Sequence, residues 1–144
     1  MSNSLIETLE PIFGVKIANL VIRMNGITGR DWRVVQGRRT IAEQNSLYAQ
    51  GRTSPGKVVT KAPGGSSAHN FGLAADLAPM KSDGSDIDWG ASRDLFQKLA
   101  DTAQNEFGLV AGFYFHSLFD PDHIESPDWK DEQAKWKSGE LSIA

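Results

Sequence analysis

The amino-acid sequence predicts a single α+β domain. Its expected helices and strands are segregated along the chain rather than strictly alternating, which is typical of that class. The chain has 144 residues, a length that suits one domain with a sizeable core. A hydrophobic content of 40% and a charged content of 23% are ordinary for a soluble globular protein. No repeat, low-complexity tract or linker divides the chain, so we expect one domain over residues 1–144.

Composition and charge exclude several classes of protein. The net charge of −3 gives no sign of a nucleic-acid-binding protein. The sequence has no cysteine, which excludes a disulfide framework and a thiolate metal site. No apolar run approaches the ~20 residues that span a bilayer, and the N-terminus lacks the basic and apolar regions of a signal peptide. We therefore expect a monomer that folds in a cytoplasm and binds neither nucleic acid nor membrane.

Two helices are expected at the N-terminus. Ser4 and Glu7 have the spacing of a capping box, which predicts a helix that starts near residue 5. Pro11 can open a second helix. Apolar residues recur in that helix at helical spacing, namely Phe13, Ile17, Leu20 and Met24. Gly26 and Gly29 are expected to end it.

A strand, a helix and a second strand are expected next. Residues 32–36 have the composition of a strand. Thr40 and Glu43 form a capping box that starts a helix, and Gly51 is its expected stop. Residues 57–61 contain a Val-Val-Thr run, which favours a strand because β-branched residues are enriched in strands.

An aspartate lies inside the most apolar part of the chain. Residues 73–78 predict a short buried strand, and Asp76 interrupts this run. An ionised carboxylate is costly to bury unless a cation or strong donors meet it. His69 stands seven residues earlier, just before Gly72, where the chain can bend sharply. A loop ligand and a strand ligand can then converge on one metal ion. The alternative is a structural acid that accepts backbone N–H groups.

The second half of the chain predicts two helices and one strand. Residues 81–88 read as an exposed turn in which an aspartate caps the following helix, and a second cation held by Asp83, Asp86 and Asp88 is the alternative. A helix is expected over residues 92–107 and a strand over residues 109–115. The tail, residues 127–144, is expected to cap the domain with a helix that packs through Trp129 and Trp136.

Several blocks resemble the M15-type zinc peptidases, which comprise D-alanyl-D-alanine carboxypeptidases and dipeptidases and phage L-alanyl-D-glutamate endopeptidases. Residues 67–76 read Ser-x-His-x-x-Gly-x-x-x-Asp, similar to the family's zinc signature. Residues 37–44 are similar to its Gly-x-Arg-Ser/Thr-x-x-x-Gln block, and residues 47–56 resemble the phage endolysin branch. Residues 120–123 read Asp-x-x-His, the spacing of an acidic residue before the last zinc ligand. The blocks occur in the family's order over residues 10–126.

The resemblance implies a metal site and its catalytic groups. Zinc would be bound by His69, Asp76 and His123, and spacing alone leaves His116 as the rival third ligand. Asp120 would be the catalytic acid/base. Without cysteine, a zinc site must use histidine and carboxylate ligands, as these residues provide.

The resemblance also implies supporting roles. Arg39 would stabilise the oxyanion of the transition state, although taken alone it reads as half of a surface ion pair. Gln44 and Ser67 would contact substrate, with a turn role as the alternative for Ser67. Glu125 would lie next to the ligands and would be the next candidate for the base.

The implied fold is the small antiparallel sheet, flanked by helices, of Hedgehog and D,D-peptidase domains. The implied function is that of a zinc-dependent endolysin that hydrolyses the L-alanyl-D-glutamate bond of the peptidoglycan stem peptide. Such an enzyme would be made in the cytoplasm of a phage-infected Gram-negative host and would reach the cell wall after its release from that compartment. The alternatives are D-alanyl-D-alanine carboxypeptidase activity and a non-catalytic zinc-containing binding module. Residues 111–113 read Ala-Gly-Phe where the family often has Trp-Gly-Gly, which affects the expected substrate groove. Wall binding by the tail tryptophans stays an alternative.

Overall fold

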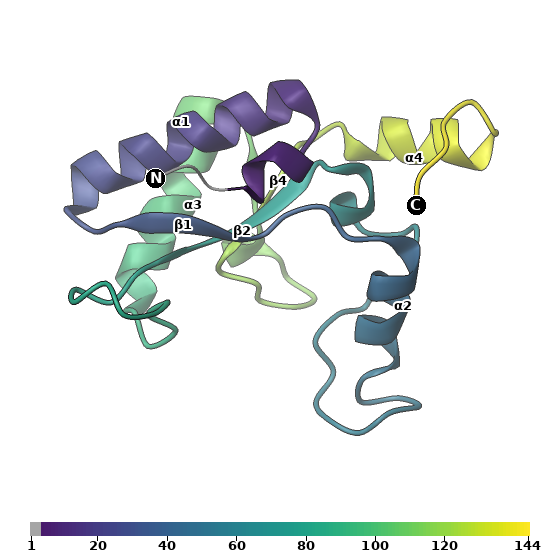
Figure 1. Ribbon diagram of the computed structural model, residues 1–144, viewed down its shortest axis with the longest axis horizontal. Coiled ribbons are helices and arrows are strands. Elements are labelled where there is room, and N and C mark those ends of the chain that lie inside the picture. The colour runs from purple at the N-terminus through teal and green to yellow at the C-terminus, as the bar shows by residue number, and fades with distance from the viewer. Residues whose placement is uncertain (1–3) are drawn as a thin grey trace.

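The computed structural model describes residues 4–144 as a four-stranded antiparallel sheet with helices packed around it (Figure 1). The helices are α1 (Pro11–Thr28), α2 (Ile41–Ala49), α3 (Arg93–Phe107) and α4 (Trp129–Lys137), with short 3₁₀ turns η1 (Ile6–Thr8), η2 (Ala68–Phe71) and η3 (Gly112–Tyr114). The strands are β1 (Trp32–Gln36), β2 (Ala74–Pro79), β3 (Val110–Ala111) and β4 (His123–Glu125), in the order β1-β2-β4-β3. The predicted α+β class with an antiparallel sheet is confirmed.

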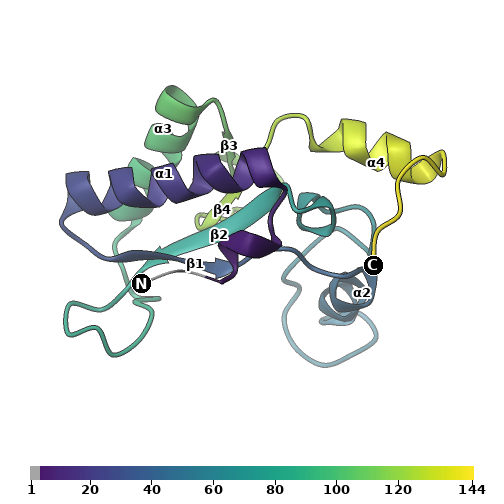
Figure 2. The ribbon, with the colours of Figure 1, turned by 45° about the horizontal axis from the view of Figure 1, so that its top comes forward.

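The hydrophobic core lies between the sheet and the helix pair α1 and α3. Figure 2 shows α1 running along the sheet with α3 beside it, and α1 contacts both β1 and α3. The four apolar residues predicted to line the second helix are all buried, as are the α3 residues Phe96, Leu99 and Ala103. They pack against strand residues that face the same side: Trp32, Val34, Ala75, Leu77 and Ile124. Within residues 4–144, no helix is long and apolar enough to cross a membrane.

The central strand β2 determines which side chains face away from this core. Side chains alternate between the two faces of a strand, so Asp76 points opposite to its neighbours Ala75 and Leu77. In the register of β2 against β4, Asp76 pairs directly with His123. Directly opposed residues have Cβ atoms only about 4.5–5.5 Å apart, so this pairing by itself brings two predicted ligands together.

The N-terminal segment differs from the prediction in two details. Residues near 5 form the short 3₁₀ turn η1 and not an α-helix, and no side chain caps it. Ser4 contributes its backbone carbonyl instead, which accepts a hydrogen bond from the Glu7 N–H. Helix α1 begins at the predicted proline, but it continues through Gly26 and ends at Gly29, which has the left-handed conformation of a C-cap.

Two predicted strands are wrong in extent. Residues 57–61 form a loop that pairs with no strand, so the β-branched run 58–60 forms no part of the described sheet. The strand expected over residues 109–115 is limited to β3 and then turns into η3. The turn occurs at Gly112, where the chain passes close to the backbone of Asp120.

Gly112 holds the loop that carries Asp120, and its replacement tests this close approach. A Cβ at residue 112 would lie 2.3 Å from the Asp120 carbonyl oxygen and 3.0 Å from the His123 Cβ. We expect Gly112→Ala to lower the free energy of unfolding by about 1–3 kcal/mol, the usual cost of overpacking, as measured by urea denaturation. Gly26→Ala is the matched control, because nothing lies within 4 Å of a Cβ there and alanine favours the helix. Equal stability of Gly112→Ala and the wild-type protein would contradict the expectation.

The turn before α3 differs from the prediction, whereas the tail agrees with it. Ser92, not an aspartate, caps α3, because its side chain accepts a hydrogen bond from the Leu95 N–H. Asp88 is instead paired with Arg30 at 2.9 Å. The tail forms α4 as predicted, and both of its tryptophans contact the Phe71 ring, with ring centroids 6.1 Å away in each case. The tail helix thus packs against the turn that carries His69.

Candidate metal centre and surrounding cavity

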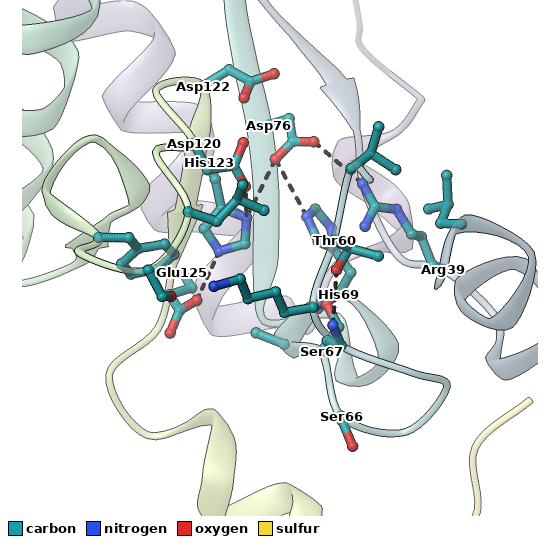
Figure 3. A pocket seen from close by; sticks show the side chains of 18 of the residues that line it. Arg39, Thr60, Ser66, Ser67, His69, Asp76, Asp120, Asp122, His123 and Glu125 are labelled. Carbon is teal, nitrogen blue, oxygen red and sulfur yellow. Dashed lines mark hydrogen bonds and ion pairs between the residues drawn. The ribbon is translucent and has the colours of Figure 1, made fainter. Parts of the chain in front are cut away.

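Three predicted ligands converge on the open face of the sheet. One atom from each of His69, Asp76 and His123 lies within 4.8 Å of the other two, and no other such group occurs within residues 4–144. The three side chains point toward one another from η2, β2 and β4 at the base of a cavity of about 380 Å³ (Figure 3). The side chains of both histidines are almost completely buried. The elements therefore bring the trio together as the sequence signature implied.

The backbone fixes the orientation of His69. Its Nδ1 lies 2.8 Å from the carbonyl oxygen of Gly37, and a carbonyl only accepts hydrogen bonds, so Nδ1 carries the proton. The other ring nitrogen, Nε2, then presents its lone pair 3.3 Å from the Asp76 Oδ1. A hydrogen bond of this kind on the far nitrogen is the usual way in which a metal-binding histidine is held.

Glu125 does the same for His123. Its Oε1 lies 2.7 Å from the His123 Nε2, which leaves Nδ1 directed at the Asp76 Oδ1 at a distance of 3.4 Å. Carboxylate–histidine pairs of this kind orient the ring and increase its basicity toward a metal. His116 is exposed and lines no part of the cavity, so the geometry favours His123 as the third ligand.

Asp76 supplies the test of whether a metal fits. Its Oδ1 is buried and, among the described residues, lacks a hydrogen-bond partner, although both histidine nitrogens face it. A buried carboxylate oxygen without a partner is costly, and a cation between these three atoms would satisfy it. Two imidazole nitrogens and one carboxylate oxygen form a donor set typical of catalytic zinc. The residues present therefore fit a zinc ion.

Asp76 and His123 also shift each other's pKa when no metal is bound. Burial would raise the pKa of Asp76, but the imidazoles of His123 and His69 next to its carboxylate outweigh this effect and lower the pKa. Burial would lower the pKa of His123, but the neighbouring carboxylates of Asp76 and Glu125 outweigh this effect and raise the pKa to about 10. At neutral pH the metal-free site therefore holds a proton on His123.

Zinc affinity should consequently fall as the pH is lowered. Between about pH 8 and pH 6 the metal-free His123 stays protonated, because both values lie below its raised pKa, and a metal must displace that proton. Asp76 adds no pH dependence there, because its lowered pKa keeps it ionised. We expect the zinc dissociation constant to increase about tenfold for each unit of pH decrease, as measured by competition with a chelator. A flat profile would show that His123 binds no metal.

Two acidic side chains lie beside the trio. Asp120 Oδ2 is 3.7 Å from the His123 Nδ1, and the Asp120 side chain is 43% exposed, so it is open to water. Burial, then the nearby charges of Asp76 and Asp120, raise the pKa of Asp122 to about 8. The raised pKa favours the neutral form of Asp122 at pH 7. Asp120 is the more exposed of the two side chains at the mouth of the site. The sequence block 120–125 contained Asp122, but nothing in its spacing indicated this raised pKa.

Arg39 lies on the other side of Asp76. Its Nη2 is 3.4 Å from the Asp76 Oδ2, and its Nη1 donates to the Gln44 Oε1 at 3.2 Å. The Arg39 Nε is buried and unpartnered among the described residues. Gln44 does not line the cavity: it is completely buried and donates to the Ala62 carbonyl. The structure thus places Gln44 behind Arg39, where it holds the guanidinium, and away from the predicted contact with substrate.

The remaining cavity residues include one predicted residue and several that sequence analysis missed. Ser67 lines the cavity, and its hydroxyl oxygen accepts a hydrogen bond from the His69 N–H, so it caps η2 as the alternative interpretation held. Trp129 also lines the cavity, although it belongs to the tail helix. Lys61 lines it too. Neither residue belongs to a recognisable motif, so only the fold reveals its position.

Comparisons of sequence with known proteins support the same class of site. The family model VanY, described as D-alanyl-D-alanine carboxypeptidase, matches residues 17–129. The peptidoglycan L-alanyl-D-glutamate endopeptidase CwlK of Bacillus subtilis is 50% identical over 66 residues, which are 46% of this chain and 39% of CwlK. The chain thus matches about two fifths of the length of that relative.

Comparisons with solved structures support the fold. The Serratia marcescens L-Ala D-Glu endopeptidase ChiX has a TM-score of 0.62 at 21% identity, covering 90% of this chain and 88% of ChiX. A vancomycin-resistance D,D-pentapeptidase VanY, solved in complex with Zn(II), has a TM-score of 0.58 at 15% identity and covers 91% and 79% of the two chains. The Streptococcus pneumoniae L,D-carboxypeptidase DacB has a TM-score of 0.57 at 24% identity, and the match covers 93% of this chain and 73% of DacB.

Proposed function

The chain belongs to the VanY family of D-alanyl-D-alanine carboxypeptidases, and from this premise we propose that it is a zinc-dependent peptidoglycan peptidase. The observation that carries the proposal is the buried trio His69, Asp76 and His123, whose free donor atoms face one another beside the exposed carboxylate of Asp120. A binding module would need no accessible carboxyl group beside its metal site, whereas a hydrolase needs one to move protons.

In the proposed reaction, a water molecule attacks the carbonyl carbon of a peptide bond. Zinc held by the trio would supply Lewis acidity, polarising that carbonyl and making water a stronger nucleophile. Asp120 accepts the proton of the attacking water and then donates it to the leaving amine as the C–N bond breaks. Its exposure of 43% lets the carboxylate reach both water and substrate.

Arg39 and the groups behind the histidines complete the proposed machinery. The Arg39 guanidinium, held by Gln44 and Asp76, would face the negative charge that develops on the carbonyl oxygen. Gly37 and Glu125 keep the two imidazole rings in one orientation, so the site does not need to reorganise during the reaction. Ser67 would donate its hydroxyl proton to substrate while its oxygen caps η2.

The bond proposed to be cleaved is L-alanyl-D-glutamate. Identity of 50% to an endopeptidase named for that bond supports this choice, as does the endolysin-like block at residues 47–56. The second candidate is the terminal D-alanyl-D-alanine bond, which is favoured by the description of the matching family model. Both reactions use the same catalytic groups and differ only in which part of the stem peptide occupies the cavity.

Digestion of purified peptidoglycan distinguishes the two reactions. The endopeptidase should release fragments with a new N-terminal glutamate, and mass spectrometry with N-terminal labelling detects them. The carboxypeptidase should release free D-alanine and leave the stem attached to the glycan. Absence of both products with the zinc-loaded protein would reject the proposed function and favour the non-catalytic binding module.

We extend the proposal to a lytic role as a phage endolysin acting on the wall of a Gram-negative cell. The added protein should lyse cells whose outer membrane has been permeabilised and leave untreated cells intact. Lysis is followed as loss of turbidity, with the Asp120→Asn variant as the inactive control. Lysis of untreated cells at low dose would contradict this role and direct attention to Trp129 and Trp136.

A further inference from the structure

The loop segment 57–62, between α2 and η2, forms part of the cavity wall. Its residues Val59, Thr60, Lys61 and Ala62 line the same cavity as the metal-ligating trio. Its composition favours a strand, yet it pairs with no strand of the described chain. Val58 and Val59 are 45% and 47% exposed, unusually open for two consecutive β-branched residues.

The backbone of this segment has free hydrogen-bonding groups. Within residues 4–144, the peptide N–H and C=O groups of Val58, Val59 and Lys61 form no hydrogen bond. Unpaired peptide groups in a cavity wall can form backbone hydrogen bonds with an extended peptide that lies along them. Because the segment lines the cavity, such a peptide would lie next to the metal-ligating trio.

Two side chains from the α2 region hold the segment in place from behind. The buried amide of Gln44 donates to the Ala62 carbonyl at 2.9 Å and to the Thr60 hydroxyl at 3.4 Å. Arg52 Nη1 donates to the Thr60 carbonyl at 3.1 Å. These bonds use the carbonyls of residues 60 and 62 and leave the groups between them available. The wall is therefore positioned without a strand partner.

Lys61 gives this wall a charge. The cavity is lined by four acidic residues and by two cations, Arg39 and Lys61. The Arg39 guanidinium is already paired with Asp76, whereas Lys61 forms no ion pair with any residue from 4 to 144. An anionic group that enters this acidic cavity therefore finds one uncommitted cation. The D-glutamate of a stem peptide is joined through its side-chain carboxyl, so its α-carboxylate is free and directly follows the proposed scissile bond.

We propose that the stem peptide lies extended along residues 58–62 and that the Lys61 ammonium binds the α-carboxylate of its D-glutamate. Lys61 is then a specificity-determining residue that favours free glutamate over its α-amide. This inference rests on the proposed endopeptidase function. It adds a substrate feature to that function, namely the α-carboxylate on the residue that follows the scissile bond. The terminal D-alanyl-D-alanine unit has the same group after its scissile bond, so Lys61 selects for the carboxylate and not between the two bonds.

The test compares two synthetic stem peptides that differ in one group. One carries the free α-carboxylate of γ-linked D-glutamate, and the other carries the α-carboxamide at the same position. The zinc-loaded wild-type protein should cleave the carboxylate peptide with a kcat/KM about fivefold to tenfold higher than that for the carboxamide peptide. This factor lies between the usual contribution of an exposed ion pair and that of a hydrogen bond to a charged group. Lys61→Met should remove this preference by slowing only the carboxylate peptide, and Lys61→Arg should keep it.

Lys57→Met is the matched control, because Lys57 lies on the same segment but lines no part of the cavity. It should keep the wild-type preference. A preference that survives in Lys61→Met would overturn the proposal, as would an equal loss in Lys57→Met.

A binding measurement separates this inference from the proposed function. Calorimetric titration of each peptide into the zinc-loaded Asp120→Asn variant measures binding without turnover. The carboxylate peptide should bind about fivefold to tenfold more tightly than the carboxamide peptide. This difference should disappear in the double variant that also carries Lys61→Met. If the wild-type protein cleaves neither peptide, the proposed function fails while this comparison still decides the role of Lys61. Equal affinity for both peptides would overturn it.

Discussion

Asp120→Asn should reduce turnover of peptidoglycan by about 10²–10⁴-fold, the usual contribution of general acid–base catalysis. Asparagine has nearly the same shape but cannot accept a proton at working pH. Asp120 lies outside the trio that meets at the metal site, and its side chain is 43% exposed, so the variant should fold and bind zinc normally. Wall hydrolysis, zinc content and melting temperature measured on this one variant test the expectation.

Two other roles of Asp120 predict different results for the same variant. If Asp120 were a fourth ligand, zinc affinity would weaken and activity would recover as zinc is added. If it were only a structural cap, stability would fall by about 1 kcal/mol with activity largely kept. Near-wild-type hydrolysis would exclude the proposed mechanism. Glu125 would then be the next candidate for the base, although its carboxylate is already hydrogen-bonded to His123.

His123→Ala should abolish stoichiometric zinc binding, and with it all hydrolysis. The substitution removes one of three ligands and leaves the buried Asp76 with only one imidazole facing it. His116→Ala is the matched control, because His116 is exposed and lies outside the cavity lining, so its zinc content and activity should match the wild type. Metal analysis by mass spectrometry of the dialysed proteins gives the stoichiometry.

The opposite pattern, with zinc lost in His116→Ala and kept in His123→Ala, would show that the third ligand is misassigned. A third variant tests whether zinc is lost because the ligand is missing or because the protein unfolds. Glu125→Gln removes the charge behind His123 while an amide oxygen can still accept its hydrogen bond. It should weaken zinc binding about 10- to 100-fold, the usual cost of changing a partner behind a metal ligand.

The convergence of His69, Asp76 and His123 could be predicted from sequence because much of it depends on local patterns. An aspartate inside an apolar run is anomalous whatever the fold, and residues 74–79 form the buried strand that this run indicated. The position of His123 followed from the resemblance, and the β2–β4 register explains it physically by pairing Asp76 with His123. The capping box of Thr40 and Glu43 was also predicted correctly, whereas the one expected at Ser4 and Glu7 does not form.

The features that sequence analysis missed depend on contacts between distant segments. The 57–61 segment has the composition of a strand, but no neighbouring strand of the described chain is available to pair with it. Gln44 has the spacing of a substrate-binding residue, yet it is buried and anchors Ala62. The raised pKa of Asp122 arises from burial and from the charge of Asp76, which belongs to another strand. Residue spacing along one segment contains no information of this kind.

The position of Trp129 gives the protein a built-in optical reporter. The protein has four tryptophans, and Trp129 is the one whose indole lines the cavity. Trp32 is completely buried in the core, and Trp89 is 63% exposed on the loop before α3, so neither senses the cavity directly. Because Trp129 also stacks on Phe71, next to the turn that carries His69, its emission depends on both the wall of the cavity and the ordering of that turn. Occupancy of the cavity can therefore be followed by intrinsic fluorescence in the unlabelled protein, with Trp32 and Trp89 contributing a constant background. Trp136, which contacts the same Phe71 ring, reports only on the ordering of the turn.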